Sequence, residues 1–144
     1  MDAIFIGANL KGGNFEKSTL LTTNFENANL SRANFKNAII YNTNLKNADL
    51  RLAINLDVFR LLRASNLQNA KCSPEITKVL EEIGCLDILY KAPQEWSTDL
   101  KNNIERHKKP LGIREIQWMA TSPSIIMEKT NQKKPQQKKW PTKK

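Results

Sequence analysis

A five-residue period runs through the first third of this chain of 144 residues. Every fifth residue from position 5 to position 50 is large and apolar: Phe5, Leu10, Phe15, Leu20, Phe25, Leu30, Phe35, Ile40, Leu45 and Leu50. Two positions before each of them stands a small residue: Ala3, Ala8, Gly13, Ser18, Thr23, Ala28, Ala33, Ala38, Thr43 and Ala48. A helix repeats every ~3.6 residues and a strand every ~2, so neither could keep one face apolar throughout this run. The period therefore predicts a coil that turns regularly.

Asparagine most often stands between the small and the large residue, as in Asn9, Asn14, Asn24, Asn29, Asn34 and Asn44, with Asp49 as a related case. This pattern resembles the pentapeptide-repeat family, whose motif is a small residue, Asn or Asp, Leu or Phe, and two polar residues. The resemblance covers residues 1 to about 52 and returns at 65–72. It implies a β-solenoid, namely a right-handed, four-sided (quadrilateral) β-helix with one pentad per side and twenty residues per coil. The asparagine-rich pentads are also similar to those of many cyanobacterial members.

The twenty-residue coil can be checked against the outward charges. Residues twenty apart would be neighbours on adjacent coils, about 4.8 Å apart. Glu16 would then lie beside Lys36, and Glu26 beside Lys46, so that opposite charges meet. The same rule stacks three inward pairs: Phe5 on Phe25, Phe15 on Phe35, and Leu10 on Leu30.

Three apolar residues occupy outward positions on one side of this otherwise polar solenoid. The coil rule places Leu21 beside Tyr41, with Ile39 adjacent. One interpretation is that the C-terminal region covers them. The other is that they form a patch that binds a partner.

The period breaks after Ala53, and the phase has moved by two residues when pentads resume at Leu67 and Cys72. The intervening residues 56–63 predict a helical turn or bulge that bears Arg60 and Arg63. A bulged corner and a basic loop that binds phosphate are the two interpretations.

Helices are predicted beyond the repeat. Ser73 and Pro74 are typical of a helix start, apolar residues follow at helical spacing to Ile83, and Gly84 is typical of a helix end. This helix follows the last pentad directly, so we expect it to cap the solenoid. A second helix is predicted at about 93–108, with a stripe of Trp96, Leu100 and Ile104, and a third at 111–120. The expected organisation is a repeat at 1–72, interrupted at about 53–64, an α-helical capping region at 73–120, and a linker with a disordered tail at 121–144.

The first coil needs a partner of its own. The pentads begin almost at Met1, and Ile4 and Ile6 add apolar surface there. An open first coil presents unpaired backbone donors and acceptors. Self-association through this end is the preferred interpretation, and a chain truncated from a longer repeat protein would look the same.

Few residues could carry chemistry. His107 is the only histidine and lies in a basic run without an acidic partner set by a motif. Cys72 occupies an inward position and Cys85 follows the first helix; their spacing suits no metal site and indicates free thiols in a reducing cytosol. No glycine-rich phosphate loop is present, no apolar stretch approaches membrane-spanning length, and no signal peptide is recognisable. We therefore expect a cytoplasmic protein that is not an enzyme and has no catalytic, metal-binding or cofactor-binding residues.

The net charge of +9 is unevenly distributed. Residues 1–72 hold nine basic and five acidic residues, residues 73–128 hold seven and nine, and residues 129–144 hold seven lysines and no acid. The tail either keeps the chain in solution or contacts a polyanion, with lysines on phosphates and Trp140 stacked on a base. The candidate residues for this contact are Lys133, Lys134, Lys138, Lys139, Trp140, Lys143 and Lys144.

Two classes of function follow. The first is a non-enzymatic protein–protein interaction or scaffold module, expected from the family resemblance. The alternative is a nucleic-acid or nucleoprotein-associated factor that uses the basic tail. Some family members resemble duplex DNA and bind type II topoisomerases, but those carry acidic surfaces, whereas the repeat here is mildly basic.

Overall fold

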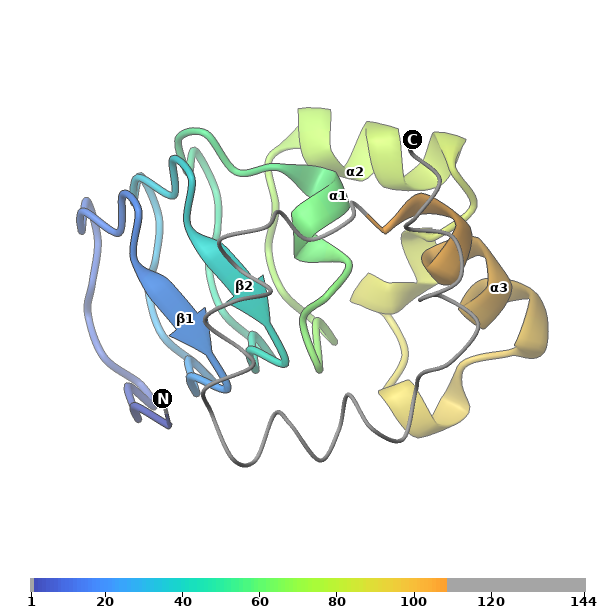
Figure 1. Ribbon diagram of the computed structural model, residues 1–144, viewed down its shortest axis with the longest axis horizontal. Helices are drawn as coiled ribbons and strands as arrows, with labels where there is room; N and C mark the ends of the chain where they lie inside the picture. Colours follow the sequence, from blue (N-terminus) through green and yellow to red (C-terminus); the bar gives the residue numbers. More distant parts are fainter. Residues whose placement is uncertain (1, 109–144) are drawn as a thin grey trace, which may run out of the picture. The chain divides into compact units, whose positions relative to one another are not determined.

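Parallel backbone pairing between residues twenty apart organises the N-terminal half of the protein. The computed structural model describes residues 2–108. Strand β1 (Thr19–Leu21) pairs with strand β2 (Ile39–Tyr41), and Thr19 lies opposite Ile39. Isolated bridges continue the same register: Ile4 with Asn24, Asn9 with Asn29, Asn14 with Asn34, Asn24 with Asn44, Asn29 with Asp49, and Asn34 with Ile54. This part of the chain is a β-solenoid, and its coils lie side by side in Figure 1.

A left-handed backbone residue at every fifth position turns the chain at each corner. Gly7, Gly12, Lys17, Thr22, Asn27, Arg32, Asn37, Asn42, Asn47 and Leu52 all have positive φ, between 52° and 72°. The asparagine one place before each central residue supports the corner, since its Oδ1 accepts the N–H two residues on, as Asn24 does from Glu26 at 3.0 Å. Asparagine forms such turns readily. This bond explains why the motif favours asparagine at that place.

The interior is filled by the central residues of the pentads. The Phe5 and Phe25 rings stack with centroids 5.4 Å apart, and the Phe15 and Phe35 rings stack at 5.5 Å, as predicted. Phe25 is fully buried. Small residues such as Ala28 and Ala33 are also buried and join the same core. The coil is thus held by the alternation of large and small inward side chains.

The break in the period forms helix α1 (Val58–Leu61). Asp57 caps this helix, because its Oδ1 accepts the N–H of Phe59 at 2.9 Å. Pairing then resumes with a longer spacing, between Asn44 and Asn66 and between Asp49 and Lys71. The predicted phase shift of two residues is therefore confirmed.

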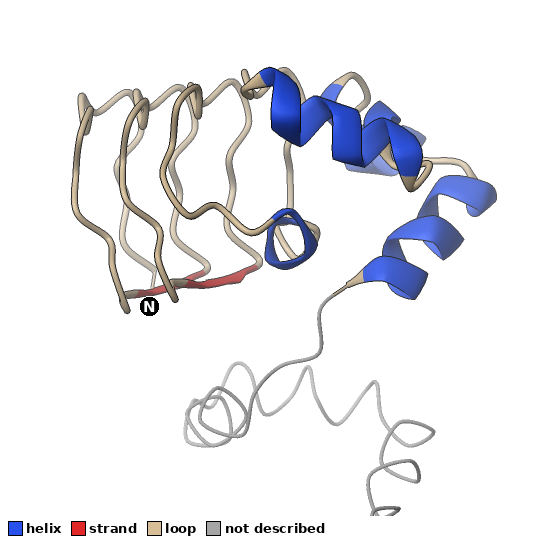
Figure 2. Cartoon of the chain, turned by 90° about the horizontal axis from the view of Figure 1, so that it is seen from above, coloured by secondary structure: helices blue, strands red, loops and turns tan. Residues whose placement is uncertain are grey.

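Helices cover the C-terminal end of the solenoid, beside its last coil (Figure 2). They are α2 (Pro74–Glu82), the 3-10 helices η1 (Leu86–Leu89) and η2 (Pro93–Glu95), and α3 (Thr98–His107). Leu80, Ile88, Leu100 and Ile104 belong to the same hydrophobic core as the pentads. Asn69 N–H also donates to the Leu89 carbonyl at 2.8 Å, so η1 is bonded to the last coil.

The prediction of one helix at about 93–108 is wrong in its first turn. The backbone of Trp96 is extended, and Ser97 starts a new helix, because its Oγ accepts the N–H of Leu100 at 3.1 Å. Leu100 and Ile104 of the expected stripe are buried on α3, and Trp96 lies before the helix as a half-buried neighbour of the core. The helix predicted at 111–120 lies outside the described residues.

Candidate functional site

His107, Cys72 and Cys85, the residues considered for chemistry in the sequence, occupy structural positions. Nδ1 of His107 lies 2.9 Å from the carbonyl oxygen of Asn103, one helical turn earlier. Cys72 and Cys85 are free thiols. Burial, and then the charge of Asp49, raise the pKa of Cys72 to about 11, and burial also raises the pKa of Cys85. Within residues 2–108, no group of His, Cys, Asp and Glu is placed to hold a metal ion, and no helix is long and apolar enough to cross a membrane.

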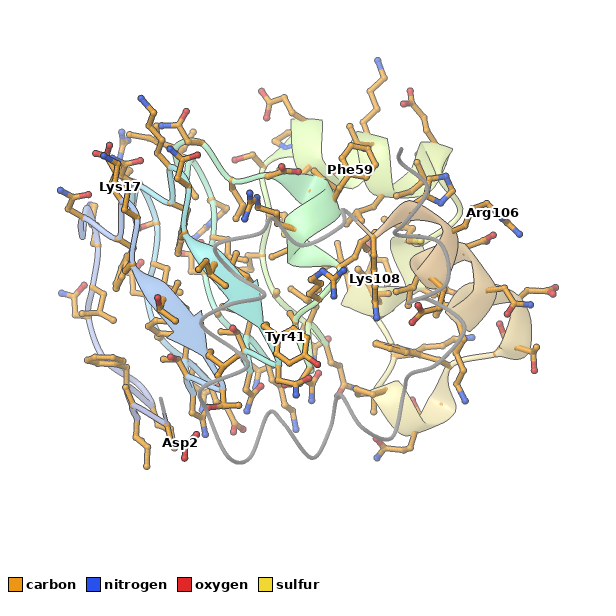
Figure 3. The ribbon with its side chains drawn as sticks, in the orientation of Figure 1. Asp2, Lys17, Tyr41, Phe59, Arg106 and Lys108 are labelled. Carbon is orange, nitrogen blue, oxygen red and sulfur yellow. The ribbon has the colours of Figure 1, made fainter. Side chains whose placement is uncertain are left out.

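The proposed patch of Leu21, Ile39 and Tyr41 is gathered on the paired strands β1 and β2. These side chains are not exposed, with accessible fractions of 2%, 4% and 9%. They lie outside the main core, and α1 packs beside β2 (Figures 1 and 3). The three residues are therefore gathered together, as the coil rule predicts, and they are buried.

The loop of Arg60 and Arg63 is a capped corner. Arg60 Nε lies 3.8 Å from Asp57 Oδ2, so the helix cap also pairs with this arginine. A surface pocket of about 360 Å³ opens beside α1, lined by Lys36, Asn55, Asp57 and Arg60 among others. Its mixture of charges gives no preference for phosphate. The tail residues proposed for polyanion binding, from Lys133 to Lys144, lie outside the described residues.

The first coil exposes three large apolar side chains in sequence. Ile4 is 71% exposed, Ile6 is 54% exposed, and even the central Phe5 is 36% exposed. The backbone N–H and C=O groups of Ile4, Asn9 and Asn14 have no hydrogen-bond partner among the described residues. Within the described residues, the first coil is thus the edge of the parallel pairing, and it has an apolar border.

The outward charges follow the predicted register. Lys17 N–H donates to the Lys36 carbonyl at 2.8 Å, and Asn27 N–H to the Lys46 carbonyl at 2.9 Å, so Glu16 and Lys36, like Glu26 and Lys46, stand on neighbouring coils. Within the described residues neither pair approaches as an ion pair. The expected placement of these residues on neighbouring coils is confirmed.

These observations define, within residues 2–108, a β-solenoid with an apolar first coil and charged sides. Residues 23–54 match the family model of pentapeptide repeats (8 copies). This stretch is therefore similar to the pentapeptide-repeat family, and the same backbone register extends from Ile4 to Ile54. No curated protein matches the chain.

Sequence reasoning found the apolar first coil, but it did not single out the outward cations Lys11, Arg32 and Arg51. Lys11 and Arg51 are two coils of twenty residues apart, and this spacing is the signal that places them on one side of the solenoid.

Proposed function

We propose that this chain is a non-enzymatic protein-interaction module built on a right-handed, four-sided β-helix. A corner every five residues and pairing every twenty support four sides per coil. Pentapeptide repeats are commonly protein-interaction modules, which supports the class of function. The free thiols of Cys72 and Cys85 support a reducing compartment such as the cytosol.

The open edge of the first coil carries this proposal. Unpaired N–H and C=O groups on an edge strand are a template for pairing with another chain. The exposed Ile4 and Ile6 flank these groups and would be removed from water by the same contact. Burial of apolar area at about 25 cal/mol per Å² then adds to the backbone bonds.

The partner at this edge is a second copy of the chain. Residues 2–21 hold two acids, Asp2 and Glu16, and two bases, Lys11 and Lys17, in a protein of net charge +9. This coil is therefore the part of the repeat where two copies meet with little net repulsion. A twofold axis would place the same edge on both copies, as in most homodimers.

Sedimentation equilibrium of the full chain tests the proposal. We expect a mass near twice 16.5 kDa for the wild type. Replacing Ile4 and Ile6 together by lysine should return the protein to the monomer, because two copies would then meet through four added charges.

The matched control replaces Leu52 and Ile54, which are 55% and 51% exposed on an inner coil, by lysine. Both backbone bonds of Ile54 are already made with the previous coil, at 2.8 and 2.9 Å. This variant should remain a dimer. A monomeric wild type at about 100 µM, near the weak end of specific association, or a control that dissociates equally, would overturn the proposal.

A further inference from the structure

One side of the solenoid carries a run of like charges through four successive coils. Its members, here called the basic column, are exposed: Lys11, Arg32, Arg51 and Lys71. The backbone register brings them together, since Arg32 N–H donates to the Arg51 carbonyl at 3.0 Å and Asp49 bridges to Lys71. Gly12 N–H donates to the Ser31 carbonyl at 2.8 Å, which joins the first coil to the same side. From this column we propose that the solenoid binds a linear chain of phosphate groups along this side.

The cations of the column lie on one side without facing one another directly. The register places Lys11 and Arg51 opposite Ser31, and Lys71 opposite Asp49. The column is therefore a row of cations with fewer acids than bases beside it. An anionic ligand would supply the missing negative charge.

Among residues 2–108, Asp49 is the acid on this side, and it is already paired with a cation. Arg51 donates from Nε to Asp49 Oδ1 at 2.9 Å and from Nη2 to Oδ2 at 2.7 Å. These bonds lower the pKa of Asp49, so it stays ionised at neutral pH. The four cations and one acid leave an excess of three positive charges on this side.

The surface beside the column is hollow. A pocket of about 340 Å³ is lined by Lys11, Arg32 and Arg51, together with the hydroxyl-bearing Ser31 and Ser73. Guanidinium groups bind phosphate through two parallel N–H donors, and lysines bind it as point charges. Lys11, Arg32 and Arg51, which come from three successive coils, therefore line one pocket together with Asp49.

Charge density decides between a phosphate chain and an acidic protein strand. Three coil steps span about 15 Å. An acidic strand presents one carboxylate every ~6.6 Å on a given face and places about two charges along this length. A helical nucleic-acid strand carries one charge per ~3.4 Å and places about four. The four cations of the column match the phosphate chain more closely than the acidic strand, although Asp49 offsets one of them.

Binding measured by fluorescence anisotropy on the full chain tests this proposal. The probes are labelled oligodeoxythymidine of about ten nucleotides, a length within the range of single-strand sites, inorganic polyphosphate of similar charge, and a polyglutamate peptide. The test variant is Lys11→Glu with Lys71→Glu. The control is Lys17→Glu with Lys36→Glu, which changes the net charge equally at exposed positions away from the column (Figure 3 labels Lys17).

We expect the test variant to weaken phosphate-chain binding at least tenfold, while the control changes it by less than about threefold. The slope of log affinity against log salt should fall in magnitude by about 1.4 in the test variant, since each phosphate contact on a single strand contributes ~0.7. The residues beyond 108 are unchanged in both variants, so their contribution cancels.

Three results would overturn the proposal: equal losses in both variants, unchanged phosphate binding in the test variant, and polyglutamate binding as tight as either phosphate chain. The last would assign the column to an acidic protein. Circular dichroism should show both variants folded, and a milder Arg32→Gln variant should give a smaller loss in the same direction. Binding of the oligonucleotide alone identifies nucleic acid as the source of the phosphates, and binding of both phosphate probes identifies the phosphate chain itself.

Discussion

At the scale of single residues, each pentad contains its own corner device. Asn34 shows it clearly, since its Oδ1 accepts the N–H of Lys36 at 3.0 Å and also Nδ2 of Asn55 from the next coil at 3.2 Å. The first bond turns the chain and the second ties two coils. Residues such as Lys17 and Arg32 adopt the same left-handed backbone without the advantage of glycine or asparagine. The regular structure therefore imposes this conformation on them.

Cys72 should make the free energy of unfolding fall at alkaline pH. Its pKa is about 11 in the folded protein against an ordinary value of 9.0, so folding favours the protonated thiol. The stabilisation is complete below pH 9 and is lost as pH rises through about 11; two pKa units correspond to about 2–3 kcal/mol. Urea unfolding at several pH values should show this loss in the wild type and a smaller one in Cys72→Ala. Parallel curves for the two proteins would contradict it.

Gly84 is required after helix α2 for two reasons. Its φ is +77°, and a Cβ there would lie 2.6 Å from Asn103 Nδ2, which donates to the Gly84 carbonyl at 3.1 Å. Gly84→Ala should cost about 1–2 kcal/mol for the left-handed backbone and about 1 kcal/mol more for the displaced hydrogen bond. Thermal unfolding measures the loss.

Gly7→Ala is the control for this prediction, because φ is +69° there and an added Cβ meets nothing within 4 Å. It should cost only the backbone part. The excess cost of Gly84→Ala should also disappear in an Asn103→Ala background. An excess that persists there would show that Asn103 is not its cause.

At the scale of elements, helix α2 and the last coils share one core. Leu80 is fully buried, and it belongs to the same hydrophobic cluster as Leu50 and Leu67 of the repeat. Cys85 N–H donates to the Leu80 carbonyl at 2.8 Å, so the chain reverses directly onto that core. Each solenoid end exposes a layer of apolar side chains, and a cap removes such a layer from water.

Leu80→Asp should therefore unfold the coils together with the helix, because it buries an unpaired carboxylate in the shared core. The loss should exceed about 3 kcal/mol, the range of severe core substitutions. Lys78→Asp introduces the same residue at an exposed position of the same helix and should leave the protein folded. Far-UV circular dichroism and thermal unfolding compare the two. A β signal that survives Leu80→Asp would refute the capping role.

At the scale of the whole described molecule, the two ends of the solenoid differ. One end is covered by α2, η1 and α3, and the other exposes Ile4, Phe5 and Ile6 (Figure 2). Phe5 and Phe25 occupy equivalent positions in adjacent coils, yet Phe5 is 36% exposed and Phe25 is fully buried. The two ends of the solenoid therefore differ in how much apolar surface they expose. Association through the first coil would produce a closed pair with the helical caps outward.

The sequence by itself determined the coil, its register and its inward rows. These follow from a local pattern that repeats every five residues, so Phe5 and Phe25 could be paired without knowledge of any distant contact. The start of α2 at Pro74 and the left-handed Gly84 were also local, since caps depend on a few neighbouring residues. The match of residues 23–54 to the pentapeptide-repeat model confirms the predicted repeat.

The tertiary structure alone decided which surfaces remain open. Leu21, Ile39 and Tyr41 are buried although their positions face away from the core, because burial depends on what packs against a strand. The break at Trp96 arose where the capping bond of Ser97 outweighed a continuous helical pattern. The register after the break in the period was also decided by the tertiary structure, since pairing at a spacing of 22 residues places Lys71 opposite Asp49. A local period specifies the turns of the coil, whereas the exposure of a residue depends on segments that are distant in the sequence.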